Sequence, residues 1–162
     1  MNHTLKSLAF VLAIFCFHSK ANAESNPHQF IDSQAQEMVS IIRNNQALYA
    51  SDPELFKDKI NTVFEPMVDF RRVGASVMGK KYYLAASKSQ RLQFIQSFKA
   101  SLLDTYSSTL AQWGDQKIVT IFPEVSELET TEDVQQNLIT SSNIYPITYK
   151  VRKDKNGNWL II

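Results

Sequence analysis

The sequence predicts an α+β fold in which N-terminal helices pack on one face of an antiparallel β-sheet meander. Two observations indicate this fold. Between Asn26 and Gly114, apolar side chains recur at the spacing of amphipathic helices. After Gly114, short β-branched segments with alternating polarity replace them. Helices followed by strands, rather than helices alternating with strands, favour separate helical and sheet layers over a parallel sheet.

The first 23 residues have the pattern of a cleavable secretory signal. The run "LAFVLAIFCF" is apolar but too short for a permanent membrane span, and "ANA" at 21–23 is a small-x-small cleavage site. A lipid anchor on Cys16 is the alternative, but bulky residues precede this cysteine where small ones would be expected. We therefore expect residues 1–23 to be a signal peptide and residues 24–162 to form a single domain.

The composition of residues 24–162 excludes several kinds of site. This part has no cysteine, a single histidine (His28), and 15 Lys and Arg against 16 Asp and Glu. Disulfides, zinc sites and Cys-His or Ser-His-Asp catalysis are therefore excluded. The near-neutral charge argues against nucleic acid as a partner. His28 stands in the first turn of a helix, where we expect a solvated or capping role.

Four helices are predicted from their caps and apolar spacing. Asn26-Pro27 and Asp52-Pro53 each combine an N-cap with a proline at the first helical position. Pro66 interrupts the second helix, and Asp69 caps a short third helix that stops at Gly79. A capping box opens the fourth helix, which ends at Gly114. Its box residues are Ser87 and Gln90, and its predicted inward stripe is Leu92, Ile95, Phe98, Leu102, Tyr106, Leu110 and Trp113.

The remaining chain predicts four strands. The segments "QKIVTIF", "VQQNLITSS", "YPITYKVR" and "NWLII" are rich in β-branched or aromatic residues. In the third, Ile147, Tyr149 and Val151 alternate with polar residues, which indicates one buried and one solvated face. Asn156-Gly157 predicts the turn between the last two strands.

Catalysis finds little support in the sequence. A carboxylate cluster lies between two predicted strands, where a solvated loop explains it better than a calcium or acid–base site. Its members are Glu124, Glu127, Glu129, Glu132 and Asp133. The whole chain has four glycines and no phosphate-binding loop. The aromatic residues on predicted inward faces fit a filled core or a core with a cavity equally well.

The stretch from 65 to 110 resembles the signature region of the MlaC, or Ttg2D toluene-tolerance, family. It supplies, in order and without gaps, the elements of that pattern: Pro66, Val68-Asp69-Phe70, Met78-Gly79, Tyr82-Tyr83, Ser87, Gln90-Arg91, Phe94, Phe98, Leu102-Leu103 and Thr105-Tyr106. Tyr149, Gly157 and Trp159 also fit the sheet of the family.

The resemblance implies a periplasmic phospholipid carrier that is not an enzyme and needs no cofactor or metal. Such proteins hold the acyl chains of phospholipid in an apolar cavity between sheet and helices. They shuttle it between an outer-membrane lipoprotein complex and an inner-membrane ABC transporter with its substrate-binding subunit, which maintains outer-membrane lipid asymmetry. We expect the cavity wall to comprise Phe64, Val68, Phe70, Val73, Val77, Phe94, Phe98, Leu102, Tyr106, Tyr149 and Trp159.

The basic residues of this region have two interpretations. Arg71, Arg72, Lys80 and Lys81 either line the cavity mouth, where they favour an anionic headgroup, or form a solvated basic face. Asp69 is expected to act as a helix cap rather than as a lipid ligand.

Relatives in this family continue past the tryptophan-containing strand into a further segment and a C-terminal helix. Here the sequence stops at Ile162. We therefore expect an incomplete domain, an uncovered last strand and weak lipid retention. Two other functions remain open. An enzyme for a small apolar substrate would need a buried polar pair such as Asp69 with Tyr106, and a periplasmic chaperone would need an open apolar surface.

Overall fold

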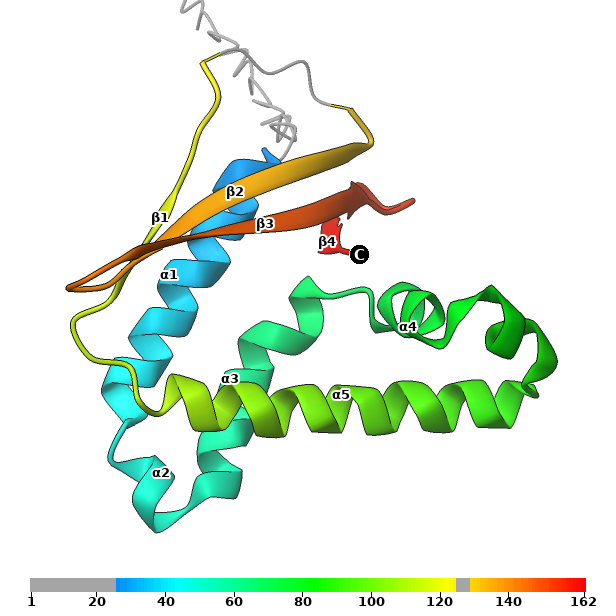
Figure 1. The fold of residues 1–162 in the computed structure, drawn as a ribbon, viewed down its shortest axis with the longest axis horizontal. Coiled ribbons are helices and arrows are strands. Elements are labelled where there is room, and N and C mark those ends of the chain that lie inside the picture. The colour runs from blue at the N-terminus through cyan, green and yellow to red at the C-terminus, as the bar shows by residue number, and fades with distance from the viewer. Residues whose placement is uncertain (1–25, 125–128) are drawn as a thin grey trace, which may run out of the picture.

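The computed structural model describes residues 26–124 and 129–162, so the predicted signal peptide and Glu127 lie outside it. Five helices precede four strands (Figure 1), which confirms the α+β prediction. The helices are α1 (Pro27–Asn45), α2 (Leu48–Ser51), α3 (Pro53–Met67), α4 (Phe70–Ala85) and α5 (Lys88–Leu110). The strands are β1 (Lys117–Thr120), β2 (Thr131–Ile139), β3 (Ile144–Lys153) and β4 (Trp159–Ile161).

The predicted caps are confirmed as the starts of α1, α3, α4 and α5. The side chains of Asn26, Asp52 and Asp69 each accept a hydrogen bond from the backbone of the first helical turn that follows. Ser87 and Gln90 form both hydrogen bonds of the capping box. These bonds satisfy backbone N–H groups that have no partner inside the helix.

The structure differs from the sequence prediction at two expected helix breaks, Pro66 and Gly79. Pro66 lies in the last turn of α3, which continues to Met67. Gly79 does break the helical conformation, with φ 73° and ψ 154°, but the chain resumes a helical course to Ala85. This backbone region is open to glycine alone, so Gly79 acts as a bend within α4 rather than as its end. The one-turn helix α2 was not predicted.

The sheet is a meander with the order β1-β2-β3-β4, and every neighbouring pair is antiparallel. The turn from β3 to β4 contains Gly157 at φ 86°. Asp154 holds this turn, because its carboxylate accepts from the backbone N–H groups of Asn158 and Asn156. These hydrogen bonds lower the pKa of Asp154, and the one from Asn158 has the largest effect.

The last strand is covered, contrary to the expectation from the sequence. Trp159 is only 2% exposed, and the backbone N–H of Asp69 donates to the carbonyl of Ile161 at 2.9 Å. Val68 forms a parallel bridge with Ile161. The junction between α3 and α4 therefore lies along the outer edge of β4 and provides a hydrogen-bond partner for part of its backbone.

Polar side chains join α1 to β1. His28, Asp32 and Gln36, each four residues apart on the helix, hydrogen bond to the carbonyl of Ile121, the hydroxyl of Thr120 and the carbonyl of Ile118. Of the two roles expected for His28, solvated or capping, the solvated one is wrong, because the residue is only 6% exposed. The buried ring has a hydrogen-bond partner, because its Nδ1 lies 3.2 Å from the carbonyl of Ile121, directly after β1.

The buried apolar residues form two clusters. The sheet cluster, between α1 and the sheet, comprises Ile31, Val134, Val151 and Trp159. The helical cluster, between α1, α3 and α5, comprises Ile42, Phe56, Ile60 and Leu103. The helix α1 contributes to both clusters.

The predicted inward stripe of α5 is only partly correct. Leu92 is half exposed, whereas Leu103, outside the stripe, is buried. The reason is that α5 packs against α4 near its start and against α3 further along, so its buried face changes along its length.

Candidate functional site

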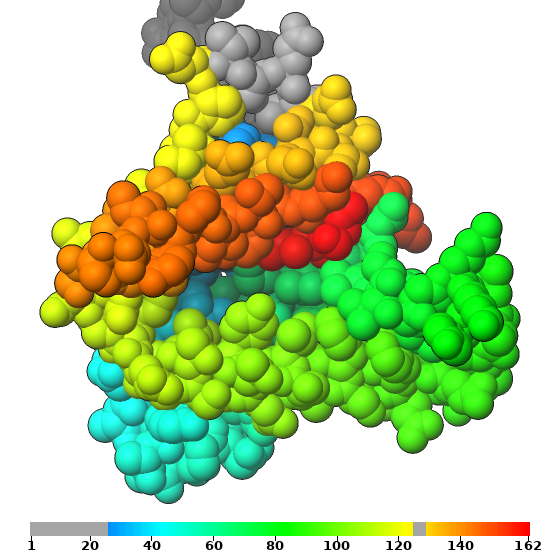
Figure 2. Space-filling model, viewed as in Figure 1, coloured from blue at the N-terminus to red at the C-terminus, as the bar shows by residue number. Residues whose placement is uncertain are grey.

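The candidate site is the space between the two clusters, called here the central gap. Backbone contacts tie the sheet to α1 and α3, and tie α5 to α3 and α4. Figure 2 shows the molecule hollowed between strands β3 and β4 and the helix α5. A domain of this size usually buries its apolar residues in one continuous core. Here the cores remain separate, and their facing margins are only partly buried.

Aromatic side chains from four elements meet at the central gap. Phe64 of α3 packs on the margin of the helical cluster, and Tyr149 of β3 packs on the margin of the sheet cluster. Tyr106 of α5 lies between these margins, with its ring centroid 6.0 Å from that of Phe64. Burial, and then the neighbouring Tyr106, raise the pKa of Tyr149. Phe70 continues the row at 5.5 Å from Phe64.

Tyr106 is 49% exposed although it faces apolar neighbours. An aromatic ring with contacts on one side and an opening on the other lines a cleft rather than fills a core. The combination of Phe64, Phe70, Tyr106 and Tyr149 therefore makes an apolar wall that stays accessible from outside. Such a wall suits hydrocarbon, which needs apolar contact and no directed hydrogen bonds.

The other predicted wall residues occupy different places. Trp159 lies within the sheet cluster. Phe94 and Phe98 stack on each other along α5 at 6.1 Å, and Leu102 beside them is half buried. Val68 and Val73 are half buried near the start of α4, whereas Val77, halfway along it, is 55% exposed. The structure thus gathers some of the predicted wall at the central gap and distributes the rest along α4 and α5.

The four predicted mouth residues are all exposed, but they lie in two pairs. Arg71 and Arg72 are in the first turn of α4, next to the edge of β4. Lys80 and Lys81 follow the bend at Gly79, at the opposite end of the helix. The carboxylate of Asp69 accepts from the backbone N–H of Arg72, which confirms its role as a cap.

Ion pairs hold α5 against α3 beneath the central gap. Lys99 meets Glu65 at 2.6 Å, and Lys57 meets Asp104 at 2.7 Å. Hydrogen bonds from Lys99 and then Asn61 lower the pKa of Glu65. Hydrogen bonds to Asp104 and then to Glu54 raise the pKa of Lys57. The sequence did not indicate these pairs, because their members lie on different helices and share no local spacing.

The buried polar pair suggested for an enzyme, Asp69 with Tyr106, is not formed. Asp69 serves as a helix cap and Tyr106 is half exposed, so this pair is not a buried polar site. Within residues 26–124 and 129–162, no group of three or more His, Cys, Asp or Glu side chains is placed to hold a metal ion.

Comparison with known proteins places the chain in a family. The family model described as MlaC protein matches residues 32–162. The chain belongs to the MlaC family. This match confirms the family predicted from the resemblance of residues 65–110 to the MlaC signature region.

Two curated members of the MlaC family are similar over most of this chain. One is the toluene tolerance protein Ttg2D of Pseudomonas putida, 28% identical over 141 residues. The other is the intermembrane phospholipid transport system binding protein MlaC of Haemophilus influenzae, 27% identical over 157 residues. The alignments cover 86% and 95% of this chain, and 64% and 73% of the respective relatives. The chain therefore spans about two thirds of the length of these MlaC proteins.

A solved structure shares the MlaC fold seen here. It is a phospholipid-binding protein from Ralstonia solanacearum, determined in complex with a phospholipid. The two folds superpose with a TM-score of 0.76 at 18% sequence identity, over 85% of this chain and 75% of the other. Among the described residues, every helix is too short or too polar to cross a bilayer.

Proposed function

We propose that this MlaC-family protein binds a phospholipid with its acyl chains in the central gap. The observation that carries the proposal is the separation of the two clusters by half-buried aromatic side chains, namely Phe64, Tyr106 and Tyr149. Each methylene removed from water would contribute about 0.8 kcal/mol, so two acyl chains supply ample binding free energy. The similarity to proteins named for phospholipid binding and transport supports the same cargo.

The proposed role is that of a carrier between membranes and not of an enzyme. A carrier needs an apolar wall that closes on its cargo, whereas hydrolysis would need an acid–base pair that the gap does not present. We propose that the protein works in the periplasm after removal of residues 1–23 as a signal peptide. Its proposed partners are an outer-membrane lipoprotein complex and an inner-membrane ABC transporter with its substrate-binding subunit. This traffic would maintain outer-membrane lipid asymmetry.

Mass spectrometry of organic extracts tests the cargo. The full chain is expressed with its N-terminal segment, purified from the periplasm without detergent, and extracted. The sequence predicted weak lipid retention because the last strand was expected to be uncovered. Since Val68 and Asp69 contact the edge of β4, we instead expect two-chain phospholipid in a fixed ratio to protein, and a mature N-terminus at Glu24. A folded protein that yields no lipid would contradict the proposal. Co-purified peptide in place of lipid would favour a chaperone, and conversion of added lipid to lysolipid would favour an enzyme.

A further inference from the structure

The charge of the chain is unevenly distributed. Residues 70–103 contain seven Lys and Arg and no Asp or Glu, whereas the rest of the chain has ten Lys and Arg against 16 acids. This basic stretch corresponds to α4 and most of α5, which run together away from the sheet (Figure 1). A local excess of seven positive charges is large for a chain whose net charge is only +1.

Two of the seven cations already have partners in the fold. Lys99 pairs with Glu65. Arg91 donates to the carbonyls of Tyr83 and Leu84 and stacks on the ring of Tyr83 at 4.3 Å, which fastens the end of α4 to the start of α5. The remaining five are exposed and form no salt bridge within the described residues. They are Arg71, Arg72, Lys80, Lys81 and Lys88.

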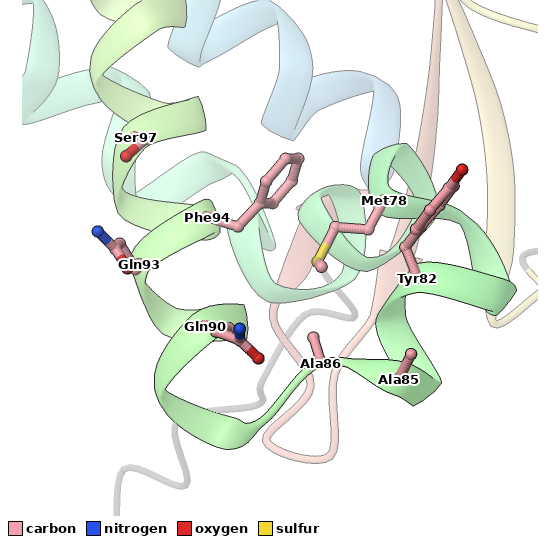
Figure 3. Close-up of a pocket in the computed structure, with 8 residues that line it drawn as sticks. All are labelled: Met78, Tyr82, Ala85, Ala86, Gln90, Gln93, Phe94 and Ser97. Atoms are coloured by element: carbon pink, nitrogen blue, oxygen red, sulfur yellow. The ribbon is translucent and has the colours of Figure 1, made fainter.

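Large apolar side chains are exposed at the same end of these helices. Tyr82 and Leu84 are each 65% exposed, Val77 is 55% exposed and Leu92 is 50% exposed. Of these four, Tyr82 also lines a shallow pocket of about 540 Å³ between α4 and α5. Figure 3 shows Met78 and Phe94 directed into this pocket from the two helices. Residues 77–92, called here the hairpin tip, thus combine apolar and basic side chains without an acidic one.

The bend at Gly79 produces this arrangement. It redirects the chain after Met78, so that Lys80, Lys81 and Tyr82 are all exposed at the end of the hairpin. Lys81 places its ammonium 5.6 Å from the centroid of the Tyr82 ring. Tyrosine with neighbouring lysine is typical of segments at the interface between lipid headgroups and hydrocarbon.

We propose that the hairpin tip docks directly on the surface of a lipid bilayer that contains anionic lipids. The lysines would contact phosphates, while Tyr82, Leu84 and Leu92 would enter the interface. A nucleic acid would match the charge but not the exposed aliphatic side chains. The surface is separate from the central gap, so docking does not require that the gap hold lipid.

Vesicle flotation with the purified full-length product tests the proposal. We expect binding to phosphatidylcholine vesicles that contain phosphatidylglycerol, little binding to pure phosphatidylcholine, and weaker binding at high salt. The double variant Lys80→Glu with Lys81→Glu should lower the partition constant about ten-fold or more. Tyr82→Ser with Leu84→Ser should also weaken binding while leaving its salt dependence in place.

A matched pair of charge reversals, one in β1 and one in the turn between β3 and β4, is the control. Lys117→Glu with Lys155→Glu changes two exposed lysines outside the hairpin tip and should leave vesicle binding nearly unchanged. Equal loss in both double variants, or no binding of the unaltered protein to anionic vesicles, would overturn the proposal. Phospholipid co-purified with the Tyr82→Ser, Leu84→Ser variant should match that of the unaltered protein, which separates docking from cargo binding.

Discussion

At the scale of single residues, Gly74 fixes how closely α4 and α5 approach. A Cβ atom placed on Gly74 would lie 2.8 Å from Cγ1 of Ile95. Gly74→Ala gains about 1 kcal/mol of helix propensity, but overpacking costs about 1–3 kcal/mol. We therefore expect Gly74→Ala to lower the free energy of unfolding, as measured by urea denaturation.

The partner residue provides the control for this prediction. Ile95→Ala removes the atom that a new Cβ would meet, so Gly74→Ala should cost less in that background. Additive effects of the two substitutions would contradict the close contact.

Glu65 predicts a pH dependence of stability. Its pKa lies below the ordinary value of 4.5 because Lys99 and Asn61 donate hydrogen bonds to the carboxylate. A lowered pKa in the folded state contributes stability above the unfolded pKa, and this contribution is lost as the pH falls through the folded pKa. The melting temperature should therefore decline below about pH 4.5, with a smaller decline in Glu65→Gln. An identical pH profile in the variant would show that the pair adds nothing.

At the scale of elements, the contact between α1 and β1 depends on a buried polar chain. Thr120 donates to Asp32 and accepts from Gln136, each at 2.8 Å, and Gln136 is fully buried. Thr120→Val keeps the shape but leaves both partners without this hydroxyl. We expect a loss of about 1–3 kcal/mol in unfolding free energy, or more.

Thr148→Val serves as the matched control, because Thr148 is an exposed threonine on β3. This substitution should change stability by less than about 0.5 kcal/mol. If both variants unfold at the same denaturant concentration, the polar chain does not stabilise the contact.

The helices and strands could largely be predicted from the sequence, because their signals are local. Asn26, Asp52, Asp69 and Ser87 each form the predicted cap. The buried face of α5 could not be predicted in the same way. Whether Leu92 or Leu103 is buried depends on which helix lies beside each turn, and that is a property of the tertiary arrangement.

At the scale of the whole molecule, the exposed ring of Tyr106 tests the central gap as a lipid site. Tyr106→Asp places a carboxylate beside Phe64 and Tyr149, where bound hydrocarbon would remove water from this charge at a large free-energy cost. We expect the amount of co-purified phospholipid to fall about ten-fold or more, with the fold retained because this side chain is already half exposed.

Tyr145→Asp offers a control of the same chemistry, because Tyr145 is 50% exposed and Tyr106 is 49% exposed. It should retain the lipid. Equal lipid content in the two variants, measured by mass spectrometry, would move the cargo away from the central gap.

The existence of the gap could not be predicted from the residues alone. Phe64 and Tyr149 fit an inward position equally well in a filled core and in a divided one. What separates them is the way α5 packs on α3 and α4 while the sheet packs on α1. The spacing of apolar residues predicts which side chains are buried but not which element each one packs against.

The helix α1 supplies Ile31 to the sheet cluster and Ile42 to the helical cluster. Without cargo, the two halves share this helix and α3 but little continuous core, so we expect each half to open on its own. Local opening events of this kind appear in amide hydrogen exchange as units with different protection. A lipid between the clusters would touch both and join their opening into one event. Cargo would then act as the missing part of the core, and its release would restore the independent motion of the halves.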